Sequence, residues 1–177
     1  MGIGLIYHAH RYQNIGMKTA QQALSALAAL CSRSEQAESD LREKLRRWLI
    51  APDEAEQIIR RLKQENFLSD ERYARAFVRD KARFNGWGRI KIAHALRQKH
   101  IDSQWIEQAL ADEIDDAAYH DTLIRLMQGK LRSVASREPQ AARAALLRFA
   151  ASRGFESDLC YRCLDEVWRA NDLTDDQ

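Results

Sequence analysis

Four arginines recur at three- and four-residue steps within one predicted helix, and their spacing is the clearest sign of chemistry in this sequence. They are Arg72, Arg75, Arg79 and Arg83. Side chains three and four residues apart share one side of a helix, so these guanidinium groups form a continuous ridge. A merely solvated face normally mixes its charges to make i,i+4 pairs, and this ridge contains no acid. We therefore predict that the ridge binds an anionic or acidic partner.

The ridge is part of a wider segregation of charge along the chain. Residues 72–99 include nine basic residues and a single acid, Asp80. The basic residues are Arg72, Arg75, Arg79, Lys81, Arg83, Arg89, Lys91, Arg97 and Lys99. Residues 104–121 hold six acids and no lysine or arginine, although the net charge of the whole chain is only +2. This order predicts a protein that is electrically polarised along its length and steers an anionic partner to its middle segment.

Other residue types that catalyse reactions do not assemble into a catalytic motif. The spacings of His94, His100 and His120 bring no two of them onto one helical face. No serine lies in a nucleophile elbow, and no zinc-protease motif occurs. Acidic pairs at residues 112–113 and 115–116 fall at a predicted helix junction, where the helix dipole favours acids, so we interpret them as solvated capping charges. We predict that the chain is not an enzyme.

A short glycine-containing segment fits a structural role better than a ligand site. Residues 85–88, Asn-Gly-Trp-Gly, place two glycines near a helix start, but a dinucleotide fingerprint would need a third glycine where Lys91 stands. We interpret the segment as a tight turn between helices. Trp87 is expected to pack between repeats rather than to serve as a stacking platform for nucleobases.

The cysteines do not predict a metal site. Cys160 and Cys163 have the spacing of half a zinc site, and a four-ligand site needs a second pair. The other close pair of metal-ligand residues, His8 and His10, lies in the N-terminal arm. We expect reduced structural thiols, no bound metal and no cofactor.

Composition favours a helical protein without a membrane segment. The 177 residues include only two prolines and seven glycines, and alanine, leucine, arginine, glutamate and glutamine are abundant. No run of eighteen apolar residues occurs, and the N-terminus lacks the apolar core of a secretion signal. We expect a cytoplasmic protein.

A helical hairpin pattern recurs three times, at intervals of 51 and 54 residues. The apolar pairs that mark equivalent points are Leu45 with Ile50, Leu96 with Ile101, and Ala150 with Phe155. Such recurrence is typical of helical repeat proteins, which present extended binding surfaces. We predict an all-α fold of three tandem three-helix repeats in an elongated, curved array, either right- or left-handed. The predicted parts are a disordered arm at 1–16, repeats at 17–67, 68–113 (the basic one) and 114–170, and an acidic tail at 171–177.

Local signals predict the junction between the second and third helices. The apolar stripe of the second helix is expected to extend to Leu49, and Pro52 is expected to end this helix, because proline disfavours the helical conformation of the residue before it. Asp53 and Glu56 have the spacing of a capping box, which would open the third helix.

Three stretches of the sequence resemble the RecX family of regulatory proteins. The central stretch consists of Phe67-Leu68-Ser69-Asp70-Glu71-Arg72-Tyr73-Ala74-Arg75-Ala76-Phe77, then Gly86-Trp87-Gly88, Lys91-Ile92, Leu96 and Lys99-His100-Ile101. The other two are Asp40-Leu41-Arg42-Glu43-Lys44-Leu45 and Arg153-Gly154-Phe155. The resemblance covers about residues 18–170 and is most specific in the centre.

Two residues depart from the family pattern at helix ends. Asn66 and His100 stand where the family commonly has glycine. Both can still adopt the left-handed conformation that closes a helix. Gly154 is a glycine just past the eighth predicted helix, and the ninth helix is predicted to span residues 157–170.

The resemblance implies a protein that binds the filament of the RecA recombinase. Such a protein inhibits strand exchange and ATP hydrolysis by RecA, so modulating DNA repair and the SOS response, and has no active site of its own. The residues expected to contact the filament or DNA are the nine basic residues of the middle segment. We expect a monomer, with single- or double-stranded DNA as a further candidate ligand.

Two other functions stay open at this point. One is a helix-turn-helix protein that binds DNA without RecA and uses the basic segment for phosphates. A dedicated DNA reader needs Asn, Gln or Arg at the exposed start of a helix, and Ser103-Gln104, which comes closest, is surrounded by acids. The other is a structural scaffold that binds an acidic helical partner.

Overall fold

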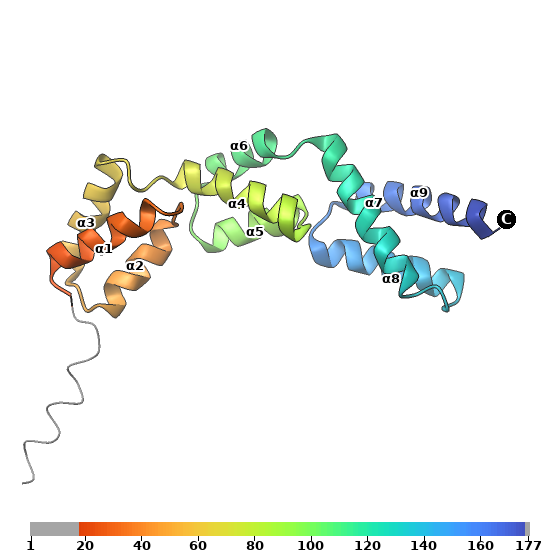
Figure 1. The fold of residues 1–177 in the computed structure, drawn as a ribbon, viewed down its shortest axis with the longest axis horizontal. Coiled ribbons are helices and arrows are strands. Elements are labelled where there is room, and N and C mark those ends of the chain that lie inside the picture. Colours follow the sequence, from red (N-terminus) through yellow and green to blue (C-terminus); the bar gives the residue numbers. More distant parts are fainter. Residues whose placement is uncertain (1–17, 176–177) are drawn as a thin grey trace, which may run out of the picture. The chain divides into compact units, whose positions relative to one another are not determined.

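The structure, a computed structural model, describes residues 18–175, and within that range it contains helices and turns but no strand. The helices are α1 (Ala20–Cys31), α2 (Glu38–Arg47), α3 (Pro52–Gln64), α4 (Asp70–Asn85), α5 (Arg89–Gln98), α6 (Ser103–Glu113), α7 (Asp116–Arg132), α8 (Pro139–Arg153) and α9 (Ser157–Asp175) (Figure 1). The predicted all-α fold is confirmed. The predicted arm at 1–16 lies outside the described residues. Helix α9 continues to Asp175, past its predicted end at residue 170.

The chain divides into two compact units. The first unit ends at Tyr73 and the second begins at Ala74. Helices α1–α3 and the first turn of α4 therefore belong to the first unit, and the rest of α4 with α5–α9 belongs to the second. No helix in the described part of the chain is long and apolar enough to cross a membrane.

In the first unit, α3 packs against both α1 and α2 around an apolar core (Figure 1). The largest fully buried side chains of this core are Leu27, Leu41, Leu45, Ile59 and Leu62. They recur at helical spacing within each element, because only one face of each helix meets its neighbours. Burial of each such side chain contributes roughly 1.5–3 kcal/mol, so the core is the main source of stability in this unit.

The junction between α2 and α3 differs from the prediction. Helix α2 already ends at Arg47, and Pro52 begins α3 instead of ending α2. Proline suits the first helical position because its missing N–H would have no partner there. The N-cap residue is Ala51, without a side-chain hydrogen bond, so the predicted capping box of Asp53 does not form. Leu49, predicted to extend the apolar stripe, is 67% exposed.

The recurring apolar pairs of the sequence close the second helix of each group of three. In each case the N–H of the later residue donates to the carbonyl of the earlier one: Ile50 to Leu45 (3.1 Å), Ile101 to Leu96 (3.2 Å) and Phe155 to Ala150 (3.3 Å). This six-residue closure is a Schellman motif, in which the two side chains also meet across the helix end. The later residues are all buried. The pattern that suggested repeats therefore marks a repeated helix stop.

Each of these stops requires a left-handed residue just before the buried apolar one. Leu49 (φ 57°), His100 (φ 60°) and Gly154 (φ 83°) occupy the three positions. Asn66, with φ 60°, closes α3 in the same way. The predicted left-handed roles of Asn66, His100 and Gly154 are confirmed. Only glycine takes this conformation without a steric penalty, so Leu49 and His100 are strained positions.

We expect His100→Gly to raise the free energy of unfolding by about 0.5–1 kcal/mol, because it relieves left-handed strain at an exposed position. Urea denaturation followed by circular dichroism measures the change. His94→Gly, an exposed position inside α5, is the matched control and should lower stability by about 1 kcal/mol. Equal losses in the two variants would show that His100 is not strained.

In the first unit, Glu38 at the start of α2 joins two helices through ion pairs. Its carboxylate oxygens accept from Arg42 Nε of the same helix (2.6 Å) and from Lys63 Nζ of α3 (2.5 Å). Burial alone would raise the pKa of Glu38, but the hydrogen bonds from Lys63 and Arg42 outweigh it and hold the pKa below its ordinary value. The charged carboxylate therefore stabilises the folded state.

We expect Glu38→Gln to lower the free energy of unfolding by about 1 kcal/mol at pH 7, since both cations are partly exposed. A carboxyl with a lowered pKa contributes stability above its ordinary pKa and loses this contribution as pH falls through its folded value. The two proteins should therefore become equally stable in strong acid. Thermal unfolding across a pH series measures this, and a difference that persists in acid would contradict it.

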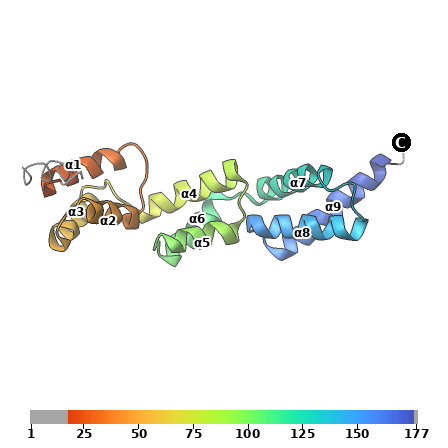
Figure 2. The same cartoon turned by 90° about the horizontal axis from the view of Figure 1, so that it is seen from below.

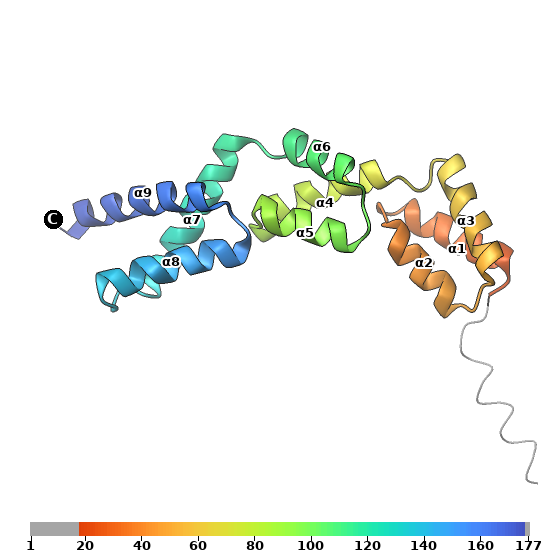
Figure 3. The same cartoon turned by 180° about the vertical axis from the view of Figure 1, so that it is seen from behind.

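In the second unit, α7, α8 and α9 pack against one another, and α5 packs against α6 (Figures 2 and 3). Fully buried side chains of α4–α6 include Val78, Ile92, Leu96 and Ile106, and those of α7–α9 include Leu123, Met127 and Leu146. Each of the two helix groups, α4–α6 and α7–α9, therefore has fully buried apolar side chains of its own.

The two helix groups of the second unit meet end to end, where the last turn of α8 abuts the first turn of α5. The N–H of Gly88 donates to the carbonyl of Arg153 (2.8 Å), and that of Ile90 donates to the carbonyl of Gly154 (3.0 Å). Helix α5 has no side-chain cap, so these carbonyls satisfy donors that would otherwise lack a partner. The contact also brings the negative end of one helix dipole to the positive end of another.

Candidate partner-binding surface

The acids of α6 neutralise part of the arginine ridge. Arg75 Nη2 lies 2.8 Å from Asp112 Oδ2 and its Nη1 lies 3.5 Å from Glu113 Oε1, while Arg79 Nη1 lies 2.9 Å from Glu113 Oε2. Charges that are segregated in the sequence are therefore paired in space. These pairs reduce the predicted polarisation of the chain at this point, and they correct the interpretation of Asp112 and Glu113 as charges that only solvent surrounds.

The first arginine of the ridge is also engaged, within the first unit. Arg72 Nε donates to Glu35 Oε1 (2.7 Å), its Nη1 donates to the Asn66 side chain (2.6 Å), and its Nη2 donates to the Asn66 carbonyl (2.9 Å). One guanidinium thereby ties the turn after α3 to the segment before α2. A residue with these contacts contributes more to folding than to binding a partner.

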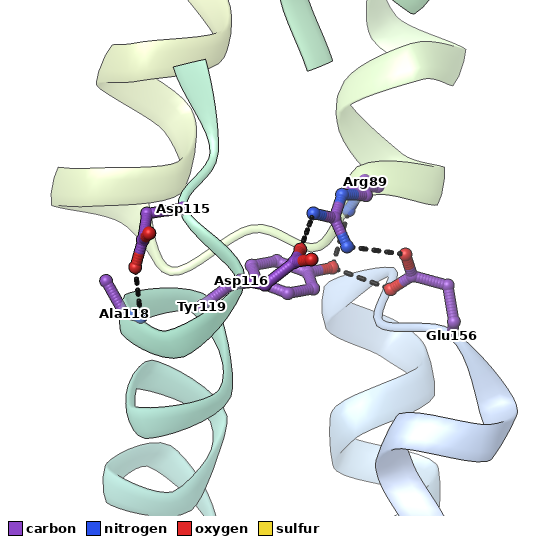
Figure 4. Close-up of polar contacts among 6 residues, drawn as sticks. All are labelled: Arg89, Asp115, Asp116, Ala118, Tyr119 and Glu156. Atoms are coloured by element: carbon purple, nitrogen blue, oxygen red, sulfur yellow. Dashed lines mark hydrogen bonds and ion pairs between the residues drawn. The ribbon is translucent and has the colours of Figure 1, made fainter. Parts of the chain in front are cut away.

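Arg89, at the start of α5, lies at the centre of a polar cluster with residues of α7 and the α8–α9 turn. Its guanidinium reaches Asp116 Oδ1 (2.6 Å) and Glu156 Oε1 (3.4 Å), as Figure 4 shows. It also lies over the ring of Tyr119, 4.5 Å from the ring centroid. Asp116 lies in the first turn of α7 and its side chain is 90% exposed, so its interpretation as a solvated charge at a helix start is confirmed, and the ion pair with Arg89 is an addition to it. Asp115 does cap α7, because its carboxylate accepts from the N–H of Ala118 (2.8 Å).

The buried Tyr119 hydroxyl links two members of this cluster. Its hydroxyl accepts from the N–H of Arg89 (2.9 Å) and donates to Glu156 Oε2 (2.7 Å) (Figure 4). Burial raises the pKa of the Tyr119 hydroxyl, and the hydrogen bond to Glu156 raises it further, so the proton stays on the oxygen. Neither Tyr119 nor Glu156 stands out in the sequence, because residues so far apart in the chain carry no local signal of their contact.

Two of the three lysines of the middle segment lie over an aromatic side chain. Lys81 Nζ is 5.3 Å and Lys91 Nζ is 4.7 Å from the centroid of a Trp87 ring. Trp87 is half-buried and meets Phe77 edge to face, with ring centroids 6.4 Å apart. These contacts favour the interpretation of Trp87 as a packing residue, and they hold both ammonium groups near the α4–α5 turn.

Two of the nine predicted residues are exposed arginines without an ion pair among the described residues. Arg83 near the end of α4 and Arg97 near the end of α5 are exposed and make no ion pair within the described residues. Lys99, half-buried, is the C-cap residue of α5. The structure thus leaves Arg83 and Arg97, which we call the unpaired arginines, as the part of the predicted set most available to a partner.

The cysteines of α9 are buried thiols. Burial raises the pKa of Cys160 and raises that of Cys163 to about 11. A thiol of this kind remains protonated at neutral pH and is a poor nucleophile and metal ligand. Among the described residues, no three histidine, cysteine or acidic side chains come together as a metal-binding group.

The sequence matches known proteins over nearly its whole length. A model of the second three-helix domain of RecX matches residues 69–110. The regulatory protein RecX of Neisseria meningitidis serogroup C is 31% identical over 153 residues, which cover 85% of this chain and 95% of that protein. The chain belongs to the RecX family. The RecX of Chromobacterium violaceum is 32% identical, covering 84% of this chain and 93% of that one.

Solved RecX structures share the fold. A crystal structure of a regulatory protein RecX aligns with a TM-score of 0.76 and 22% identity, covering 82% of this chain and 71% of that one. RecX from Lactobacillus salivarius aligns with a TM-score of 0.74 and 20% identity, covering 84% and 96%. The RecX relatives are named regulatory proteins rather than enzymes.

Proposed function

We propose that this chain binds the RecA recombinase filament and inhibits its recombination and ATPase activities, thereby modulating DNA repair and the SOS response. It acts in the cytoplasm, as a monomer and without catalysis of its own. The observation that carries the proposal is membership of a family of regulatory proteins over 85% of the chain. The RecA partner itself comes from the resemblance of the middle segment to that family.

Charge in the middle helices supports a partner with acidic or phosphate groups. Lys81, Arg83, Lys91 and Arg97 carry no ion pair among the described residues, so their charges are not cancelled within the fold. A nucleoprotein filament offers both phosphates and acidic side chains to such a surface. We retain these residues as filament contacts and assign Arg72, Arg75, Arg79 and Arg89 mainly to folding.

The competing function, DNA binding through a helix-turn-helix without RecA, is less well supported. A reading helix must present donors to base edges in the major groove. The exposed residues of α6 include Glu107 and Asp112, which phosphates would repel. Helix α6 therefore does not fit the role of a recognition helix.

A direct comparison of two ligands tests the proposal. Fluorescently labelled protein is titrated with RecA filaments assembled on single-stranded DNA, and separately with the same DNA without RecA, at matched salt. The proposal expects tighter binding to the filament, with an affinity that weakens as salt rises. Equal affinity for naked DNA would favour the competing function, and no binding to either ligand would contradict both.

A further inference from the structure

Helices α4 and α7 of the second unit line an apolar hollow that the ion-pair clusters do not use. The cavity has a volume of about 220 Å³. Its apolar lining includes Ala82 of α4, Ile114 of the α6–α7 link, and Ala118 and Tyr119 of α7. Ile114 and Tyr119 are buried, whereas Ala118 is exposed at the mouth. The hollow thus has an apolar lining between two helices and opens to solvent.

A second, shallower depression continues along α7 from this hollow. Arg83, Ala118 and Thr122 line both cavities, so the two share one rim. Arg125 lines the second cavity as well. The hollow and this depression together form a groove, which we call the α4–α7 groove. Its apolar part is the hollow, and arginines lie along its rim.

The charged residues that line the α4–α7 groove are three arginines, Arg79, Arg83 and Arg125, and three acids, and they are not all paired with one another. Of the acids that line it, Glu113 is held by Arg75 and Arg79, and Asp115 caps α7. Arg83 makes no ion pair among the described residues, and Arg125 donates only to the hydroxyl of Thr122 (3.1 Å). The remaining acid, Asp121, lies 3.6 Å from His120 Nδ1. Arg83 at the shared rim and Arg125 at the second depression therefore have no carboxylate partner among the residues that the structure describes.

This combination fits a protein ligand better than a nucleic-acid backbone. Phosphates need cations but gain nothing from an apolar hollow, whereas protein interfaces centre on an apolar anchor buried in a pocket. Unpaired arginines at the rim favour a carboxylate beside that anchor, since arginine binds carboxylates with two parallel hydrogen bonds.

We propose that an exposed segment of a protein partner inserts one aliphatic or aromatic side chain into the α4–α7 groove and places a neighbouring carboxylate against Arg83 and Arg125. The inference rests on the proposed function in one respect, because the partner is taken to be a subunit of the RecA filament. It adds that the protein surface of the filament, rather than its DNA, occupies this groove.

A pair of matched substitutions tests the groove. Ala118→Phe fills the hollow from its mouth, and Ala117→Phe, the control, adds the same ring to an exposed neighbour that lines neither cavity. Successive residues point about 100° apart around a helix, so the control ring faces elsewhere. We expect Ala118→Phe to weaken binding to RecA filaments about tenfold and Ala117→Phe to change it less than twofold.

A charge variant tests the rim independently, so the test does not depend on how Ala118→Phe folds. Arg83→Glu with Arg125→Glu should weaken filament binding at least as much, while residual binding to naked single-stranded DNA changes no more than in an equally charged variant, Arg132→Glu with Arg137→Glu. Circular dichroism confirms that each variant is folded.

The outcomes separate the two proposals. If the parent does not bind filaments, both fail. If the parent binds and the groove variants bind equally well, the groove assignment fails and the proposed function stands. If the groove variants lose naked-DNA binding in proportion to filament binding, the groove holds nucleic acid and the assignment of a protein occupant is wrong.

Discussion

Gly88→Ala is expected to lower the free energy of unfolding of the second unit by about 3 kcal/mol or more, through a clash between two backbones. A Cβ atom at this position would lie 2.1 Å from the carbonyl oxygen of Gly154 and 2.3 Å from the nitrogen of Phe155. These are backbone atoms and cannot rotate away. Relief would require α8 to withdraw from α5, which would break the hydrogen bonds donated by Gly88 and Ile90.

The matched control for this substitution is Gly129→Ala. Gly129 is exposed inside α7, and an added Cβ would meet only the end of the Arg132 side chain, at 3.8 Å. Because alanine favours the helix over glycine by about 1 kcal/mol, the control should be slightly stabilised. Urea denaturation of both variants measures the difference. A Gly88→Ala protein as stable as the control would show that the end-to-end contact of α8 and α5 does not hold the unit together.

Reversing the two unpaired arginines, Arg83→Glu with Arg97→Glu, is expected to weaken inhibition of RecA more than tenfold and leave the melting temperature unchanged. Both side chains are exposed and unpaired in the described part of the chain, so their removal costs the fold little. The two substitutions replace two positive charges with two negative ones, and this change of four charge units opposes binding to an anionic filament surface. Inhibition of strand exchange, titrated against the parent, measures the effect.

Two further variants show whether position or net charge is responsible. Arg132→Glu with Arg137→Glu changes net charge equally, at exposed residues around the α7–α8 turn, and should retain inhibition. Arg75→Glu with Arg79→Glu should instead destabilise the fold by roughly 1–3 kcal/mol, because it sets new acids against Asp112 and Glu113. If all three variants inhibit as the parent does, the middle segment is a solvated face.

Helix type and helix ends were the features most accessible from the sequence. Periodic apolar residues predicted the all-α fold, and left-handed stops were recognised at Asn66, His100 and Gly154, because these signals are local. Leu49 escaped notice since leucine rarely adopts φ near 57°, and here the buried Ile50 that follows forces the turn. The apolar pairs were recognised as a repeat, and the structure adds the hydrogen bond that closes a helix at each pair.

The ion-pair partners of the basic segment could not be predicted from the sequence in the same way. Arg75 and Asp112 are far apart in the chain, and only the fold of α6 against α4 brings them together. A count of charge along the sequence therefore overstated the surface that is free to bind. The same limit hid the cluster around Tyr119, whose members come from three separate segments.

Steady-state ATP hydrolysis by RecA on single-stranded DNA, measured with increasing amounts of this protein, tests the central claim most directly. We predict that the parent protein lowers the rate in a concentration-dependent way, and that the folded Arg83→Glu, Arg97→Glu variant requires at least ten times more protein for the same effect. An unchanged rate with the parent protein in excess over RecA would contradict it.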